Sequence, residues 1–302
     1  MASEAYKRQV ALLLNVLPEV AKEKCLALHG GTAINLFVRD MPRLSVDIDL
    51  TYVPIEDRVT SLDNMAAALE RVKANIERVV PNVRVNHRKE IGKLQISRQG
   101  VDVKLEVNLI SRGLLATPIK MTLCAKAQIE FDAFCTIDVV PTGQLYGGKI
   151  CAALDRQHPR DLFDVKYLMG NEGFTNEIKE GFLLRLLSGE RPVNEVLFPN
   201  LKDQRAALDN QFAGMSEEVF DYTEYELVRD RLIKTVHDSL TEKDKQFILS
   251  VKNVTPDWSI YNFERFPAIA WKLQNLQRLK DKNPDKHREQ YEALEQKLNS
   301  IQ

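Results

Sequence analysis

A glycine turn and a pair of acids lie close together in the stretch from Leu28 to Leu50. Gly30 and Gly31 follow a short apolar run and precede residues whose apolar positions recur at helical spacing, which predicts a strand, a tight turn and a helix. Glycines there let the backbone approach a ligand closely, and the free amides at the start of a helix favour an anion such as a triphosphate. The stretch therefore predicts a phosphate-binding turn.

Two aspartates follow this turn on a predicted strand. Asp47 and Asp49 are two residues apart in an apolar run over 46–53. Because side chains alternate along a strand, both carboxylates point to one side, where they would share a divalent cation. The competing interpretation is an ordinary turn followed by acids on an exposed strand end. The combination of glycines and acids is more specific than either feature alone.

A third acid is expected on a neighbouring strand over 101–109. There the odd-numbered residues are apolar, whereas Asp102, Lys104, Glu106 and Asn108 share the other face. Two acids on one strand and a third beside them can hold one or two magnesium ions for in-line phosphoryl or nucleotidyl displacement. Glu106 is the candidate for the third acid, and Asp102 is the less favoured substitute because it lies at the hairpin end.

A second cluster of charged residues lies between Gly143 and Met169. Lys149 falls among apolar residues of a predicted helix, where it would either extend to the surface or neutralise a triphosphate. Asp161 and Asp164 are three apart and so share a helix face. For Asp161 the pattern favours a role as an acid at the start of a helix, satisfying free amides and the helix dipole.

The first half of the chain alternates predicted helices and strands. Apolar spacing predicts helices over 6–17 and 62–80, the second ended by Pro81. Alternation predicts strands at 83–87, 93–97, 101–109, 119–124 and 134–140, and the second and third of these strands are joined by a hairpin turn at 98–100.

Strand signals end near Thr142, and helical spacing continues from there to the C-terminus. We therefore expect an α+β fold with two lobes, a mixed-sheet lobe over 1–141 and an all-helical lobe over 142–302.

Composition narrows the class of protein. The 302 residues are 44% hydrophobic and carry a formal net charge of −1, which predicts a globular protein without a generally basic surface. No run is long and apolar enough for a membrane span and no signal peptide is evident, so we expect a cytoplasmic protein. The four cysteines and five histidines show no metal-binding spacing.

Basic residues gather in two places that would track an RNA backbone. The residues around the first lobe's helix–strand junction are Arg71, Lys73, Arg78, Arg84, Arg88, Lys89 and Lys93. The stretch Trp271–Gln302 carries seven Lys/Arg against five Asp/Glu, and its alternating charges favour a solvated helix face.

Taken in order, these motifs resemble the AbiEii/AbiGii (MenT-like) toxin family of nucleotidyltransferases, within the polymerase-β-type superfamily. The resemblance covers about residues 25–170 and rests on four motifs: the GGT turn, Arg43-x-Ser45-x-Asp47-x-Asp49, Lys104-x-Glu106-x-Asn108, and Lys149 through Arg160-Asp161-x-x-Asp164. It implies a polymerase-β-type lobe followed by a helical lobe. It also implies transfer of a nucleotide from an NTP to an acceptor, the 3′ end of tRNA in studied relatives.

The resemblance also implies roles for individual residues. Gly30, Gly31 and Thr32 would hold phosphate, with Arg43 and Ser45 near the nucleotide. Asp47 and Asp49 would bind Mg²⁺, and Lys149 and Asp164 from the helical lobe would complete the catalytic site. Thr32 replaces the serine of many superfamily members and keeps its hydroxyl, while Glu106 replaces the usual aspartate as third metal ligand.

Partners follow from the same resemblance. We expect a monomer that uses an NTP, acts on tRNA or another RNA, and is neutralised by a cognate antitoxin protein in a toxin–antitoxin or phage-defence system. Two alternatives remain open at this point: a nucleotidyltransferase that modifies a small molecule or a protein hydroxyl, and a non-catalytic nucleotide- or RNA-binding protein.

Overall fold

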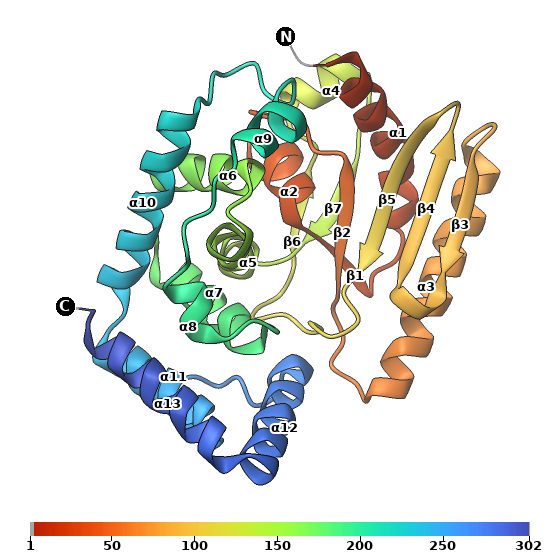
Figure 1. The fold of residues 1–302 in the computed structure, drawn as a ribbon. Coiled ribbons are helices and arrows are strands. Elements are labelled where there is room, and N and C mark those ends of the chain that lie inside the picture. Colours follow the sequence, from red (N-terminus) through yellow and green to blue (C-terminus); the bar gives the residue numbers. More distant parts are fainter. Residues whose placement is uncertain (1–2, 302) are drawn as a thin grey trace. The chain divides into compact units, whose positions relative to one another are not determined.

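The computed structural model describes residues 3–301, and the chain forms two compact units (Figure 1). Unit 1 comprises Met1–Pro141 and Asp209–Val219, and unit 2 comprises Thr142–Leu208 and Phe220–Gln302. The first unit thus takes in a short segment that comes from far along the chain.

Unit 1 is built on a mixed seven-stranded sheet in the order β3-β4-β5-β2-β1-β7-β6. The strands are β1 (Leu26–His29), β2 (Asp47–Tyr52), β3 (Arg84–Arg88), β4 (Lys93–Arg98), β5 (Val101–Val107), β6 (Ile119–Thr122) and β7 (Thr136–Val139). The β2–β5 and β1–β7 pairs are parallel, and the other neighbouring strands are antiparallel. The structure therefore confirms the predicted mixed sheet.

Two long helices cover one face of this sheet. Helix α1 (Glu4–Val20) packs on β5 and β7, and α3 (Arg58–Val79) packs on β3 and β4. The buried apolar positions of the strands, such as Leu94, Ile96 and Leu105, lie on the covered face. Helix α3 begins one turn before the predicted start because the Asp57 carboxylate accepts hydrogen bonds from the amides of Val59 and Thr60.

Short helices complete unit 1. Helix α2 (Gly30–Ala33) follows β1 directly and continues as a π-helical turn, η1 (Ile34–Val38). A 3₁₀ turn, η2 (Lys89–Ile91), joins β3 to β4. Helix α4 (Ala125–Phe131) lies in a stretch for which sequence periodicity predicted no element, because a helix of two turns has too few apolar positions to show a period.

Unit 2 contains only helical elements among its described residues. These are α5 (Thr142–Arg156), α6 (Pro159–Gly170), α7 (Asn176–Ser188), α8 (Val193–Leu197), α9 (Arg205–Ala207), α10 (Tyr222–Ser239), α11 (Glu242–Lys252), α12 (Pro267–Lys282) and α13 (Pro284–Asn299). A further π-helical turn, η3 (Leu208–Phe212), follows α9, and all of it after Leu208 belongs to unit 1. No helix in residues 3–301 has both the length and the apolar character that a membrane crossing needs.

Glycines hold α5 and α7 in close contact. A Cβ atom added to Gly147 would collide with the backbone of Gly181 and Phe182, and one added to Gly181 would collide with the backbone of Gly143. The two helix backbones approach so closely that no side chain fits between them. Lys149 follows Gly147 by two residues on the same helix, α5.

We expect Gly147→Ala to destabilise unit 2 by about 3 kcal/mol, because the added methyl meets backbone atoms that cannot move independently. Thermal unfolding followed by circular dichroism measures the change. Gly170→Ala is the control, since no atom lies within 4 Å of the added Cβ, and its stability should stay within about 0.5 kcal/mol of the parent. Equal stability of the two variants would contradict the close helix contact.

Candidate active site

The glycine turn holds the carboxylate of Asp49. Strand β1 ends at His29, and Gly30 has a φ of +72°, which side-chain-bearing residues rarely adopt. A Cβ at Gly30 would overlap the Asp49 carboxylate oxygen Oδ2. Glycine is therefore needed both for the backbone conformation and for the space that the carboxylate occupies.

Strand pairing brings the acids together on one face. His29 of β1 lies opposite Asp49 of β2, and Asp49 lies opposite Glu106 of β5. Asp47 shares the face of Asp49, as the alternation predicted, and its partner on β5 is Lys104. Asp49 is exposed, whereas Asp47 and Glu106 are partly buried. The parallel pairing of β2 with β5 thus sets three carboxylates on adjacent positions of one sheet face.

The register distinguishes Glu106 from Asp102, the other candidate for the third acid. Asp102 lies opposite Ser97 near the hairpin turn and accepts a hydrogen bond from the Ser97 hydroxyl, whereas Glu106 lies beside Asp49. The Glu106 carboxylate forms an ion pair with Lys93 of β4. Within residues 3–301 no three His, Cys, Asp or Glu side chains are close enough together to hold a metal ion. The metal-ligand role of Glu106 stays a prediction.

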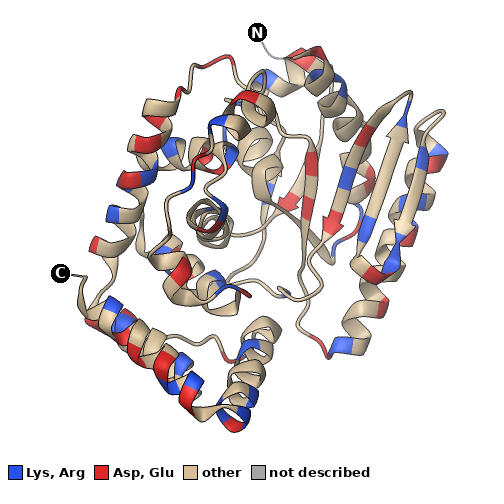
Figure 2. Ribbon diagram, viewed as in Figure 1, with Lys and Arg blue, Asp and Glu red and all other residues tan. Residues whose placement is uncertain are grey.

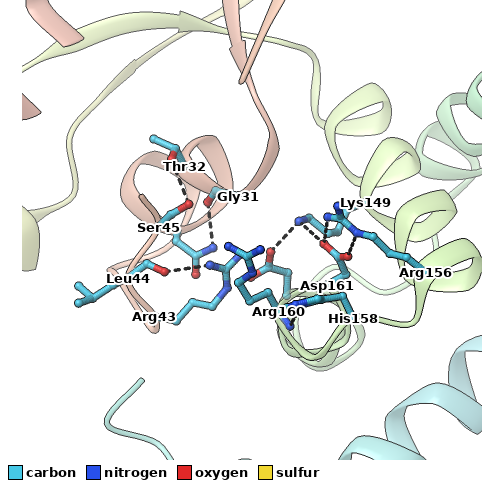
Figure 3. A network of polar contacts seen from close by, with 12 residues as sticks. Gly31, Thr32, Arg43, Leu44, Ser45, Lys149, Arg156, His158, Arg160 and Asp161 are labelled. Atoms are coloured by element: carbon cyan, nitrogen blue, oxygen red, sulfur yellow. Dashed lines mark hydrogen bonds and ion pairs between the residues drawn. The ribbon is translucent and has the colours of Figure 1, made fainter. Parts of the chain in front are cut away.

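The loop between α2 and β2 packs against the glycine turn (Figure 3). The Thr32 hydroxyl donates to the backbone carbonyl of Asp47 and lies 3.0 Å from Ser45 Oγ. A Cβ at Gly31 would come within 2.8 Å of Arg43 Nη2 and 3.1 Å of Ser45 Oγ. The guanidinium and both hydroxyls therefore surround the turn, although whether they contact a nucleotide stays a prediction.

The segment Asp209–Val219, which comes from far along the chain, forms hydrogen bonds with this loop. The amide of Leu44 donates to the carbonyl of Met215 at 2.7 Å, and the Ser216 hydroxyl donates to the carbonyl of Pro42 at 2.9 Å. Arg43 and Ser216 form an isolated antiparallel bridge. No spacing rule points to these contacts, because they join residues about 170 positions apart.

In unit 2, Lys149 is buried between two carboxylates. Its Nζ atom lies 2.9 Å from Asp161 Oδ1 (Figure 3). It also lies 3.0 Å from Asp164 Oδ2. Only 7% of the Lys149 side chain is exposed, which excludes the interpretation that it extends to the surface. The two aspartates share one face of α6, as their spacing predicted.

Asp161 lies in the first turn of α6, as predicted, but its side chain does not cap the helix. The side chain that caps α6 is His158, whose Nδ1 accepts a hydrogen bond from the Arg160 amide. Asp161 instead points toward α5 and accepts hydrogen bonds from Lys149 and from both Nε and Nη2 of Arg156. Pro159 at the first position of α6 supplies no amide proton, which leaves one fewer donor to cap.

Arg156 is a site residue that sequence reasoning missed. It ends α5, and the break at residues 157–158 brings Asp161 beside it. Burial alone would raise the pKa of Asp161, but the charges of Lys149 and Arg156 outweigh burial and hold that pKa below its ordinary value. The nearness of Arg156 and Asp161 in the sequence indicates an ion pair only when the geometry of the break between α5 and α6 is known.

We expect Asp161→Asn to cost on the order of 3 kcal/mol at neutral pH, because it leaves Lys149 and Arg156 without a shared buried counter-ion. The native pKa lies below the unfolded value of about 3.9. The stabilisation is therefore complete above that pH and is lost as the pH falls toward the native pKa.

The difference in melting temperature between the parent and Asp161→Asn should accordingly stay constant from pH 6 to about pH 4 and shrink between about pH 4 and pH 2. Asp155→Asn is the matched control, because Asp155 pairs with Arg191 where both side chains are about 40% exposed or more, and its loss should cost about 1 kcal/mol or less. A constant difference across this pH range would show that the Asp161 charge does not stabilise the fold.

Comparison with known proteins agrees with this fold. The sequence profile of the family described as "Nucleotidyl transferase AbiEii toxin, Type IV TA system" matches residues 11–275. No curated protein sequence matches the chain. Among solved structures, the chain is similar in fold to MenT4, a nucleotidyltransferase toxin from Mycobacterium tuberculosis, with a TM-score of 0.64 and 12% identity over 90% of this chain and 93% of that one. Since the profile spans most of its length, the chain belongs to the AbiEii family of nucleotidyltransferase toxins of type IV toxin–antitoxin systems.

Proposed function

We propose that this toxin uses Mg²⁺ to transfer a nucleotide from an NTP to an RNA acceptor, the 3′ end of tRNA, and that a cognate antitoxin neutralises it. Family membership supports the class of reaction. The observation that carries the proposal for this chain is the position of Asp49, which the register sets beside Glu106 and whose carboxylate lies against the Gly30 turn.

The two aspartates of β2 suit magnesium. Asp47 and Asp49 offer carboxylate oxygens on one face, and Mg²⁺ is commonly held by one or two carboxylates together with substrate phosphates. When bound, the ion would neutralise charge on the phosphates and help to orient the attacking hydroxyl. Asp47 and Asp49 would hold it, and Glu106 would be a third ligand after leaving Lys93.

The reaction also needs positively charged side chains that bind the phosphates of the NTP. The acceptor hydroxyl loses its proton to solvent, and its oxygen forms a bond to the α-phosphorus. The bond between that phosphorus and the oxygen that bridges to the β-phosphorus breaks, and pyrophosphate leaves. Arg43 beside the glycine turn and Lys149 on α5 are cations suited to binding phosphate oxygens as charge moves to the leaving group. Asp164, 3.0 Å from Lys149, would orient the ammonium group.

We expect Asp49→Asn and Lys149→Ala each to lower nucleotide incorporation by at least about 100-fold, because each removes a charge that acts on the reacting phosphates. The assay uses purified protein, radiolabelled NTPs and total tRNA with Mg²⁺ or Mn²⁺. Lys120→Gln, a change at an exposed position of β6, should leave activity unchanged.

Each other outcome has a distinct meaning. Absence of label in RNA with either metal would overturn the proposed acceptor, and label that migrates with protein would favour a protein hydroxyl instead. Full growth arrest by the Asp47→Ala/Asp49→Ala double variant would favour a non-catalytic binding protein.

A separate experiment tests the third carboxylate. We expect Glu106→Gln to raise the Mg²⁺ concentration for half-maximal activity at least about tenfold, because it removes a charged ligand beside Asp49. Asp102→Asn is the control, since Asp102 lies beside Ser97 and away from the β2 acids. An effect of Asp102→Asn larger than that of Glu106→Gln would overturn the assignment of Glu106.

A further inference from the structure

The sheet face that carries the aspartates continues across three more strands. Cα pairing aligns the residues of β2, β5, β4 and β3 in rows across the sheet. One row consists of Asp49, Glu106, Lys93 and Arg88. The next row consists of Asp47, Lys104, Gln95 and Asn86. The open face of β3, β4 and β5 is here called the sheet platform, and it begins directly beside the candidate metal ligands.

The sheet platform is a solvent-exposed surface within unit 1. Alternate residues of the same strands are buried on the opposite face, where α1 and α3 pack. On the platform, Asn86, Gln95 and Lys104 are exposed, and Lys93 is about 24% exposed. The distance from β2 across the platform to β3 is three strand spacings, or about 14 Å.

Charge changes sign from one side of the platform to the other. The outer strand β3 presents Arg84 and Arg88, both exposed, and no acid on this face. Strand β4 presents Lys93 and no acid, whereas β5 carries both basic and acidic residues. The charged residues of β2 are its two aspartates, as the coloured strands in Figure 2 show. A polyanion would therefore be attracted at β3 and directed toward the acids, where a bound cation would offset their charge.

The side chains of the platform suit a nucleic acid better than a protein. Beyond the charged residues it presents Asn86, Gln95 and Ser97, which can donate hydrogen bonds to phosphate and sugar oxygens. It presents no aromatic or aliphatic side chain. Protein interfaces have an apolar, aromatic-rich centre, whereas nucleic-acid interfaces are more polar and more positive.

We propose that the sheet platform binds the backbone of the RNA acceptor and leads its end from β3 toward Asp47 and Asp49. The proposal rests on the RNA acceptor of the proposed function. Because the platform offers no stacking or apolar groups, it contacts phosphate and ribose, so its binding tolerates any base sequence and weakens with salt.

The test compares binding of a fluorescein-labelled single-stranded RNA of mixed sequence to the full chain and to Arg84→Gln/Arg88→Gln, without NTP or metal. We expect roughly tenfold weaker binding and a salt slope, log K against log[salt], smaller in magnitude by about 1.4, since each single-strand phosphate contact contributes about 0.7. The double variant Lys120→Gln/Arg231→Gln removes two exposed charges elsewhere and should bind RNA as the parent does. Arg84→Glu/Arg88→Glu should weaken binding further, while all variants should melt at the parent's temperature.

Other outcomes show whether the platform proposal or the proposed reaction fails. Parent-like RNA affinity and salt slope in Arg84→Gln/Arg88→Gln would overturn the platform proposal. So would loss of poly-L-glutamate binding with RNA binding intact, which would assign the surface to an acidic protein. If the variant binds RNA weakly but the parent transfers no nucleotide, the platform stands and the proposed reaction fails. If the parent transfers nucleotides and the variant does so with an unchanged KM for RNA, the reaction stands and the platform fails.

Discussion

The pairing of β2 with β1 on one side and β5 on the other determines which sheet face Asp47 and Asp49 occupy and which residues lie beside them. Alternation along a strand means that a shift of one residue would turn Asp47 and Asp49 into the apolar layer and bring Ile48 to the surface. The register is strongly specified because Ile48 and Leu50 are fully or almost fully buried. Thus the hydrophobic core, rather than any contact among the polar groups, sets the acids on the open face and aligns them with Glu106.

In unit 2, ion pairs stabilise the buried charge of Lys149. Lys149 and Arg156 share the Asp161 carboxylate, and Asp164 lies on the other side of Lys149. Two cations and two carboxylates balance one another, which makes the burial of Lys149 tolerable where a single buried charge would not be.

Much of this arrangement follows from local sequence. Period-two alternation identified β2, β4 and β5 and assigned Glu106 and the aspartates to polar faces, because each signal lies within a few consecutive residues. The spacing of Asp161 and Asp164 likewise predicted a shared helix face. The pairing of Asp161 with Arg156 could not be predicted, since it depends on the angle at which α5 and α6 meet. The hydrogen bond between Leu44 and Met215 could not be predicted either, because no local pattern relates the two segments it joins. The proposed experiments test whether the predicted site residues act together in catalysis.

The return of residues 209–219 to unit 1 has a consequence for how the protein is made. The loop that carries Arg43 and Ser45 emerges early in synthesis, but its partners Met215 and Ser216 follow about 170 residues later. Unit 1 is therefore an incomplete domain on the ribosome until most of the chain exists, and cutting the chain after Pro141 would leave this loop without part of its support. The connection ties completion of unit 1 to prior translation of much of unit 2.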